Sequence, residues 1–372
     1  MSKNIEVAVI GGGIIGAATA YRLAAAGLRA TLIDAGEPGR GTSASSFAWL
    51  NSAHKEPRPY HDLNVAGMAE HTALADEFAA APWLHRDGGL HWATTPEGET
   101  RLGEHTDRLN AWGYTMERLT DAEAHELEPG LRLDPEVVRA IWHAPVEGWC
   151  DVPLLIRALL DRARELGATV RAGDGVAAVE RRGDRVTGLR LASGATLATD
   201  AVVVCAGPRT AEVAALFGVT VPVTRLPGLL AVTAPVARPL RRVCIAENIT
   251  LRADPSGGLV LAHAADLDAT IDADTPLTPP PPACAVALAR GGEFFPDVLR
   301  VGLAAARIGV RPMPADDVSI VGALPGYANA YVVATHSGVT LGPLLGRLIA
   351  EEIATGQPTA QTAPFRPDRF GG

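Results

Sequence analysis

Three glycines near the N-terminus have the spacing that favours a bound dinucleotide. Gly11, Gly13 and Gly16 form a GxGxxG motif that follows the apolar run VAVI and opens the alanine-rich segment AATAYRLAAAG. The first glycine permits a tight turn, the second lets a pyrophosphate approach the backbone, and the third lets a helix pack closely on a strand. Asp34 ends the next apolar run, RATLID, where a carboxylate can accept hydrogen bonds from a ribose diol. A merely structural glycine turn is the alternative, and the flanking runs together with Asp34 favour the dinucleotide site.

This chemistry requires a strand, a helix and a second strand to carry the four residues. Apolar periodicity predicts a strand over 7–10, a helix over 17–27 and a strand over 29–34, which is the beginning of a βαβ unit. The start of the helix would present free N–H groups and the positive end of its dipole to the phosphates.

The choice between FAD and NAD depends on where the parallel sheet resumes. An NAD-binding unit usually completes its sheet directly, whereas here the next continuous buried run, VVVCA, ends only at Ala206. Helical spacing predicts intervening helices over 62–81 and over 151–167, the second with Asp151 as its N-cap, and a strand, turn and helix follow over 330–356. The long interruption favours FAD. An NAD-dependent dehydrogenase is an alternative that predicts a colourless protein.

The composition excludes several classes of partner. The chain has 372 residues, 47% of them hydrophobic, which is enough for a large core shared by two structural units. With a net charge of -9 it has no basic stripe of the kind that nucleic acid or an anionic membrane requires. No uninterrupted apolar run reaches the length of a membrane span. The four cysteines stand far apart without metal-ligand spacing, so we predict no metal site and expect reduced thiols and a cytoplasmic location.

Five motifs spread over nearly the whole chain carry a resemblance to one family. They are VAVIGGGIIGAATAYRLA, GTSASS, DVPLLIRALLDRARELGATV, TDAVVVCAGP, and the tail from GVRPMPADDVSIVG through THSGVTLGPLLGRLIAEEI to RPDRF. In this order they resemble the D-amino-acid oxidase (DAO) superfamily of FAD-dependent oxidoreductases, which includes glycine oxidase, sarcosine oxidase and D-amino-acid dehydrogenase. The resemblance implies an α/β fold of the glutathione-reductase-like type, in which a Rossmann-type FAD-binding domain is interleaved with a mixed β-sheet substrate domain. We expect the FAD-binding domain over 1–82, 149–222 and 309–372, and the substrate-binding domain over 83–148 and 223–308.

The resemblance also implies a cofactor site. The glycine motif and Asp34 should hold the ADP half, the serine-rich loop should line the pyrophosphate and the approach to the flavin, and the backbone of Val176 should meet adenine. The turn in THSGVT should place backbone N–H groups at the pyrimidine edge of the flavin. An ordinary loop is the alternative for the serines. The implied cofactor-binding residues are Gly11, Gly13, Ile14, Ile15, Gly16, Asp34, Ala35, Thr42, Ser43, Ser45, Ser46, Val176, Ala206, Gly207, Gly309, Arg311, Ser337, Gly338, Val339 and Thr340.

Arg311 is the leading candidate for substrate recognition. It stands in GVRP, where amino-acid members of the family carry the arginine that grips the substrate carboxylate. A planar guanidinium can hold a carboxylate with two parallel hydrogen bonds. The competing hypothesis is a structural ion pair of Arg311 with Asp316 or Asp317, and we expect Arg307 to be a solvated or paired charge. Sarcosine-oxidase-like members attach FAD to a cysteine slightly before this arginine, where Gly309 is the nearest equivalent, so noncovalent FAD is expected.

Four other residues are candidates for the site. His336, next to the predicted turn, is expected to act in catalysis with Arg311, and the alternative is a histidine packed beneath the flavin loop. Tyr60 and His263 are expected as further substrate contacts. Lys55 is interpreted as a surface lysine, with a role toward oxygen or substrate as the alternative.

The activity implied by the resemblance is oxidation of a C–N bond. The substrate would be a D-amino acid, an N-alkyl glycine or a cyclic imino acid, converted to an imine by hydride transfer to flavin N5. Oxygen, or a quinone or other electron-transfer partner, would accept the electrons, which leaves oxidase and dehydrogenase open. The alternative is a flavin-carrying subunit of a multi-subunit amino-acid dehydrogenase that is not active alone.

Overall fold

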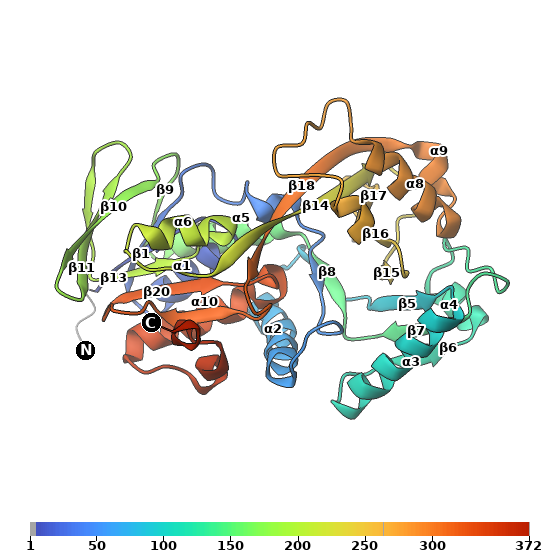
Figure 1. The fold of residues 1–372 in the computed structure, drawn as a ribbon, viewed down its shortest axis with the longest axis horizontal. Coiled ribbons are helices and arrows are strands. Elements are labelled where there is room, and N and C mark those ends of the chain that lie inside the picture. Colours follow the sequence, from blue (N-terminus) through green and yellow to red (C-terminus); the bar gives the residue numbers. More distant parts are fainter. Residues whose placement is uncertain (1–4, 263, 372) are drawn as a thin grey trace.

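The computed structural model describes residues 5–262 and 264–371, which form two lobes side by side (Figure 1). The lobe with the glycine motif is built on a six-stranded sheet in the order β19-β20-β13-β1-β2-β9. Neighbouring strands run parallel, except that β19 is antiparallel to β20. The strands are β1 (Glu6–Ile10), β2 (Arg29–Ile33), β9 (Thr169–Arg171), β13 (Ala201–Val204), β19 (Ile320–Ala323) and β20 (Ala330–Ala334). This Rossmann-type sheet confirms the predicted α/β fold.

Helices cover one face of the parallel sheet. Helix α1 (Ile14–Ala25) packs between α5 (Val152–Glu165) and α10 (Gly338–Thr355). Its small buried side chains let it lie close to the apolar strand β1, and together they form a continuous core. Asp151 caps α5 as predicted, because its carboxylate accepts a hydrogen bond of 3.2 Å from the N–H of Leu154.

Helix α2 (Arg58–Asp76) starts and ends earlier than the predicted range 62–81. Pro57 is its N-cap and Pro59 lies in its first turn. Proline is tolerated there because the first N–H groups of a helix have no intrahelical partner. Helix α2 packs against α10, so the position of α2 helps to fix the position of α10.

A smaller sheet and a short helix cover the opposite face. They are β10 (Val176–Arg182), β11 (Arg185–Leu191), β12 (Thr196–Ala198) and α6 (Thr210–Ala215). Val186 and Leu189 from β11 pack with Ala8 and Ile10 from β1 in a second core. Both faces of the parallel sheet are therefore buried, as such sheets require.

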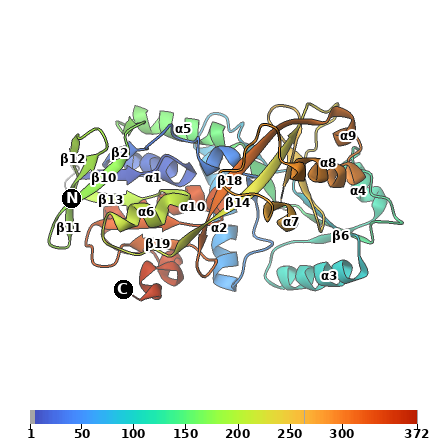
Figure 2. The same ribbon diagram turned by 45° about the horizontal axis from the view of Figure 1, so that its top comes forward.

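The second lobe is a mixed sheet of eight strands in the order β18-β14-β17-β16-β15-β5-β7-β6. Helices α8 and α9 lie on one side of it, and α3 lies beside its far end (Figure 2). The bounds are β5 (Gly89–Ala93), β6 (Glu117–Leu119), β7 (Ala140–Ala144), β14 (Val223–Thr233), β15 (Val243–Ile245), β16 (Thr250–Ala253), β17 (Leu259–Ala262), β18 (Leu303–Pro314), α3 (Pro96–Ala111), α4 (Asp121–Leu127), α7 (Ala265–Asp268), α8 (Pro282–Phe294) and α9 (Asp297–Val301). A core of Leu251, Leu261, Cys284 and Ala287 joins α8 to the sheet.

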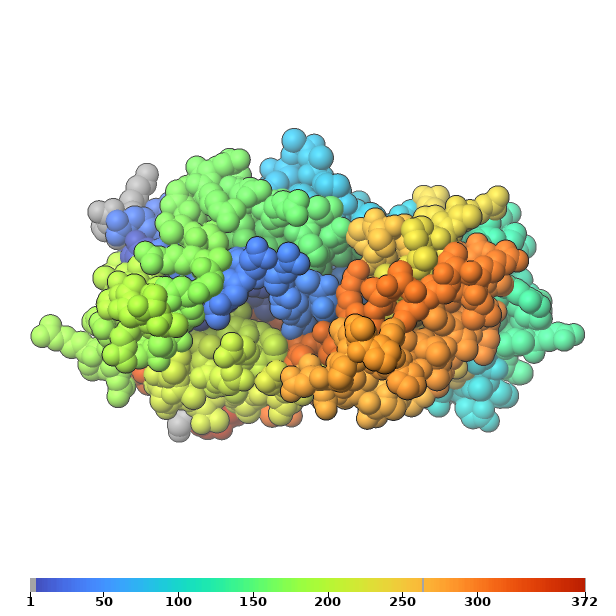
Figure 3. All heavy atoms as spheres, turned by 90° about the horizontal axis from the view of Figure 1, so that it is seen from above, coloured from blue at the N-terminus to red at the C-terminus, as the bar shows by residue number. Residues whose placement is uncertain are grey.

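The two long strands β14 and β18 connect the lobes. They pair antiparallel along their lengths, and this register sets Leu226 opposite Arg311. The proposed boundary at residue 309 falls within β18, so we propose that the two domains share this ribbon of two strands. From above, the blue N-terminal part of the chain lies in the crease between the lobes (Figure 3). A small sheet of β3 (Trp49–Leu50), β8 (Gly148–Cys150) and β4 (Leu84–His85) lies at the same junction.

The short 3-10 helices are η1 (Thr42–Ser45), η2 (Gly207–Arg209), η3 (Ala360–Phe365) and η4 (Pro367–Phe370). Within the described residues, no helix is both long enough and apolar enough to cross a membrane.

Candidate active site

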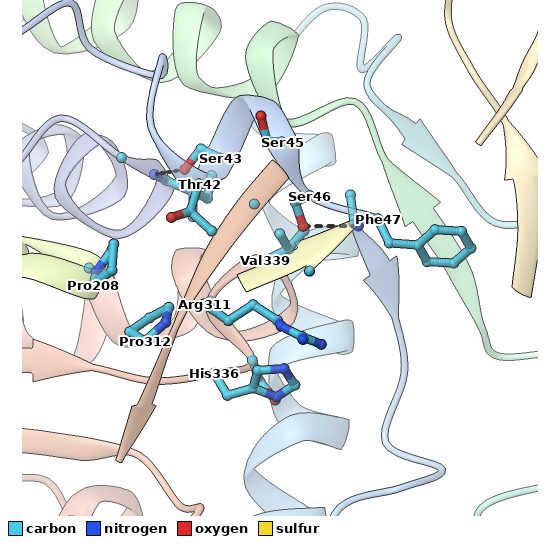
Figure 4. A pocket seen from close by; sticks show the side chains of 18 of the residues that line it. Thr42, Ser43, Ser45, Ser46, Phe47, Pro208, Arg311, Pro312, His336 and Val339 are labelled. Carbon is cyan, nitrogen blue, oxygen red and sulfur yellow. Dashed lines mark hydrogen bonds between the residues drawn. The ribbon is translucent and has the colours of Figure 1, made fainter. Parts of the chain in front are cut away.

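A cavity of about 860 Å³ opens where the parallel sheet meets the β14–β18 ribbon. Its walls come from segments far apart in the chain: the glycine turn, the serine-rich loop, the turn after β13, the turn before α10, and both ribbon strands. Arg311 on β18 and His336 in the turn before α10 point into this space, with Ser46 and Val339 beside them (Figure 4).

The glycine turn has the geometry that a phosphate cradle needs. Gly11 has a φ of +110°, and a Cβ atom there would lie 2.3 Å from the carbonyl oxygen of Cys205. A Cβ atom on Gly16 would lie 1.8 Å from the carbonyl oxygen of Gly11, so only glycine allows α1 to approach the strand this closely. The N-terminus of α1 faces the cavity, and the Ser43 hydroxyl accepts a hydrogen bond from the N–H of Ile14 at 3.1 Å.

Asp34 lies at the edge of the cavity, after β2. Its carboxylate accepts hydrogen bonds from the N–H groups of Gly12, at 2.6 Å, and Gly36, at 2.8 Å. Each carboxylate oxygen has a second lone pair, which can accept a hydroxyl from a ligand. The carboxylate is thus held in a fixed orientation beside the glycine turn.

The start of α10 forms a second site for negative charge. No acceptor within the described residues takes the N–H groups of Gly338, Val339 or Thr340, which belong to the unpaired first turn of a long helix. Tyr60 donates a hydrogen bond to the Ser337 hydroxyl at 3.0 Å and thereby supports this turn from behind. Two helix N-termini therefore face one cavity. The residues fit an extended anionic dinucleotide such as FAD, with phosphates at α1 and a polar ring edge at α10.

The serine-rich loop is fixed against β18. The Thr42 hydroxyl donates a hydrogen bond to the carbonyl of Val310, and the Cβ atom of any residue at Gly309 would lie 1.9 Å from the carbonyl oxygen of Ser45. The contact leaves no room for a side chain at position 309. Cys205 is the only cysteine among the described lining residues, and burial raises the pKa of its thiol to about 12. These observations support the expectation of noncovalent FAD.

Arg311 makes an ion pair, but not with either aspartate of the competing hypothesis. Its Nη2 atom lies 2.8 Å from Oδ2 of Asp268 in α7 and donates a second hydrogen bond to the carbonyl of Pro227. Asp316 pairs instead with Arg369, at 2.7 Å. The competing hypothesis of an ion pair with Asp316 or Asp317 is therefore wrong in its partner, because β18 continues to Pro314 and Asp316 beyond it pairs with the C-terminal segment.

Most of the predicted cofactor residues line the cavity, and a few do not. Gly16 is buried in the packing of α1, while Ala35 and Val176 lie outside the lining. Tyr60, predicted as a substrate contact, is also outside it, because its ring is buried behind the turn that it supports. His263 lies outside the described residues. Arg307 points to a separate, smaller cavity and pairs with Asp254 at 3.2 Å.

The structure adds lining residues that sequence reasoning missed or misplaced. Lys55 is half-buried in the cavity wall, which corrects its interpretation as a surface lysine, and burial lowers its pKa to about 8. Asn51 and Trp49 line the same wall, and Asp268 faces it from α7. No local pattern marks these positions. The only signal was that Lys55 is the one internal lysine in a chain otherwise rich in arginine.

Three comparisons place this geometry among known proteins. Residues 6–352 match the model of the DAO family of FAD dependent oxidoreductases. Glycine oxidase of Geobacillus kaustophilus (strain HTA426) is 28% identical, over 100% of this chain and 99% of its own. An opine oxidase subunit of Agrobacterium tumefaciens (strain Ach5) is 26% identical, over 99% of this chain and 98% of its own.

Solved structures agree with the sequence comparisons. The crystal structure of glycine oxidase from Geobacillus kaustophilus superposes with a TM-score of 0.86 at 26% identity, covering 100% of both chains. That of iminodiacetate oxidase from Chelativorans sp. BNC1 superposes with a TM-score of 0.84 at 25% identity, covering 97% of this chain and 98% of the other. Both likenesses extend over the two lobes, and that to glycine oxidase covers every element that lines the cavity.

Proposed function

Since the chain belongs to the DAO family of FAD-dependent oxidoreductases, we propose that it oxidises the C–N bond of a carboxylate-bearing amine. The substrate is a D-amino acid, an N-alkyl glycine or a cyclic imino acid, and the product is an imine. The imine hydrolyses in water, or persists if it is cyclic. The family match also decides for FAD over NAD.

The observation that carries the proposal is the position of Arg311. It faces the same cavity as the two helix N-termini that suit a dinucleotide. Bound FAD supplies a hydride acceptor for the carbon next to nitrogen. A carboxylate held by Arg311 fixes that carbon, and positioning of this kind supplies a large part of the rate of such reactions.

The guanidinium can bind a carboxylate without giving up its ion pair. Nη2 serves Asp268 and Pro227, and Nε lies 3.4 Å from the carbonyl of Leu226. Within the described residues Nη1 has no acceptor, so its N–H groups can meet a substrate oxygen. Asp268 holds the guanidinium plane in place. His336 borders the same space and can hydrogen-bond to the substrate or to the flavin.

A second candidate is a flavin-carrying subunit that needs a partner. The likeness to the opine oxidase subunit of Agrobacterium tumefaciens favours it, because that relative is one subunit of an enzyme. On this hypothesis the chain would still bind FAD and substrate, and the partner would be required for turnover. In the first case the electron acceptor is oxygen or a quinone or other electron-transfer partner, and in the second the electrons pass on through the partner subunit.

Anaerobic reduction of the flavin tests both candidates. The purified yellow protein is mixed without oxygen with D-amino acids, sarcosine, glycine and proline-like imino acids, and the loss of flavin absorbance is followed. Bleaching by at least one carboxylate-bearing amine is the expected result. Bleaching that requires a co-purified partner would favour the subunit, and bleaching by amines that lack a carboxylate as readily as by amino acids would contradict the proposal.

A further inference from the structure

The cavity contains a cation that the proposed reaction does not use. Lys55 lies in the loop between β3 and α2 and lines the same cavity as Arg311. No carboxylate, carbonyl or hydroxyl within 5–262 and 264–371 accepts a hydrogen bond from its ammonium group. The side chain is half-buried, and loss of surrounding water lowers its pKa to about 8.

The other charges of the cavity already have partners. Arg311 pairs with Asp268, and Arg209 pairs with Glu212 at 2.9 Å. Asp34 accepts two backbone N–H groups. Lys55 is therefore the lining cation without a counter-ion in the described part of the chain. A partly desolvated ammonium group gains from an anionic partner, because burial penalises an unpaired charge.

Asn51 is a second unpartnered group on the same loop. Its side chain is 6% exposed and lines the cavity, and its Oδ1 atom has no hydrogen-bond partner among the described residues. Its Nδ2 atom has one contact, at 3.4 Å, to the carbonyl of Trp49. A buried acceptor left open toward a cavity can accept a hydrogen bond from an N–H or O–H group of whatever binds there.

The loop that carries both groups is held in place. The Ser52 hydroxyl donates to the carbonyl of His61 at 2.8 Å, and the Ser52 N–H donates to the Tyr114 hydroxyl at 3.2 Å. Tyr114 in turn donates to the buried carboxylate of Glu147 at 2.7 Å. Lys55 and Asn51 therefore project from a fixed segment, as a preorganised recognition site requires.

We propose that Lys55 binds a second carboxylate of the substrate while Asn51 accepts an N–H group, so that the preferred substrates are amino or imino dicarboxylates. Arg311 holds one carboxylate and Lys55 holds the other. The second carboxylate is carried either by the other substituent of the substrate nitrogen or by the side chain of the amino acid. The remaining wall suits the carbon skeleton, because it is apolar: Leu226, Leu229, Leu230, Ile245 and Ala246. This inference rests on the proposed function, since it identifies the substrate class of the same site.

Inhibitors without an amine test the second carboxylate directly. Glutarate and butyrate have the shapes of iminodiacetate and sarcosine with carbon in place of nitrogen, and their binding to the FAD holoenzyme is read from flavin absorbance. Glutarate should bind at least tenfold more tightly than butyrate. Lys55→Met should abolish that preference without changing the Kd for butyrate, Lys55→Arg should retain part of it, and Arg58→Met, a surface variant near the same loop, should leave it intact.

Several results would overturn the assignment. Equal Kd values for glutarate and butyrate in the wild type would do so, as would a Lys55→Met variant that loses both ligands equally or neither. Lys55→Met could also keep the preference for glutarate but lose FAD, or show a changed affinity for sulfite, which adds to the flavin. Either result would place Lys55 against the flavin instead.

Anaerobic bleaching of the flavin distinguishes a failure of the second-carboxylate assignment from a failure of the proposed function. Iminodiacetate is compared with sarcosine, and D-aspartate with D-asparagine, which distinguishes a carboxylate across the nitrogen from one on the side chain. If no amine bleaches the flavin, the proposed function fails. If sarcosine and D-asparagine bleach it with the same apparent Kd as their dicarboxylate counterparts, only the second-carboxylate assignment fails.

Discussion

At the scale of single residues, the neighbours of Arg311 set the orientation of its guanidinium group. Asp268 and two backbone carbonyls orient the guanidinium, and the side chain remains 23% exposed toward the cavity. A rigid, planar cation whose Nη1 donors remain open is suited to hold a carboxylate oxygen. The same environment makes lysine a poor replacement, because its ammonium group cannot serve Asp268 and the substrate in one plane.

Replacement of Arg311 by lysine should weaken substrate binding while sparing the cofactor. We expect the apparent Kd in anaerobic bleaching to rise roughly tenfold or more, with FAD content unchanged, because one ammonium group cannot hold both Asp268 and the substrate carboxylate as Nη2 and Nη1 of the guanidinium can. Arg307→Lys is the matched control, since Arg307 lies on the same strand but faces the smaller cavity. An unchanged Kd for Arg311→Lys would remove Arg311 from substrate recognition.

Gly11→Ala should produce a protein that purifies without flavin. A methyl group at this position would lie 2.3 Å from the carbonyl oxygen of Cys205, and the φ of +110° is strained for any residue with a Cβ atom. The ratio of flavin to protein absorbance measures the loss. Gly103→Ala is the control, because a Cβ atom there meets nothing within 4 Å. Full FAD occupancy of Gly11→Ala would contradict the role of the glycine turn in binding the phosphates.

At the scale of elements, helix α2 fixes the start of α10. His71 lies 2.8 Å from the carbonyl oxygen of Val339, to which its Nε2–H donates, and a Cβ atom on Gly67 would lie 2.7 Å from the carbonyl oxygen of Thr340. Burial lowers the pKa of His71 to about 4, so the imidazole is neutral near pH 7. His71 and Gly67 of α2 thus contact the carbonyl oxygens of Val339 and Thr340 on the side away from the cavity. These contacts keep the N–H groups of the first turn of α10 directed at the cavity.

Acid should destabilise the protein through His71. The unfolded histidine binds a proton near its ordinary pKa, whereas the folded one binds it only near 4, so stability is present above the ordinary value and declines as pH falls toward 4. Between pH 7 and 5 this group alone should lower the free energy of unfolding by about 2 kcal/mol.

Urea unfolding at both pH values measures this effect. His71→Gln keeps an N–H donor for Val339 but cannot be protonated, so its stability should fall less between pH 7 and 5 than that of the wild type. An identical loss in the variant and the wild type would show that other groups cause the acid sensitivity.

At the scale of the whole molecule, the cavity is also the junction of the lobes. Arg252 from the second lobe donates to the backbone carbonyls of Phe47 and Ser46, and its guanidinium lies 4.7 Å from the ring centroid of Trp149. The β14–β18 ribbon and the serine-rich loop close the same region. A ligand bound there contacts both lobes at once, so cofactor binding and the stability of the junction are linked.

Removal of FAD should therefore lower the melting temperature by several degrees. A ligand that binds only the folded state stabilises it by about 4 kcal/mol when present at a thousand times its Kd. Thermal unfolding of the apoprotein, the holoenzyme and the apoprotein with FAD added back measures the shift. A holoenzyme that melts at the temperature of the apoprotein would show that the cavity does not hold the cofactor tightly.

Much of the fold could be predicted from the sequence, because many helices, strands and turns depend on residues that are close together in the chain. The glycine motif, the strand VAVI and the capped helix after Asp151 were predictable, since turn geometry, apolar periodicity and capping depend on neighbours in the chain. The start of α2 was predicted too late, because proline in a first turn resembles a helix breaker in sequence.

The sequence by itself determined a dinucleotide cradle and a parallel α/β core, and its resemblance to the family made Arg311 the expected carboxylate anchor. Only the tertiary structure decided that Arg311 pairs with Asp268, that Tyr60 stands behind the turn, and that Lys55 enters the cavity. The physical reason is that the partner of a charge and the burial of a side chain depend on segments far apart in the chain. Periodicity and spacing describe one segment at a time, whereas many segments far apart in the chain meet to form the cavity.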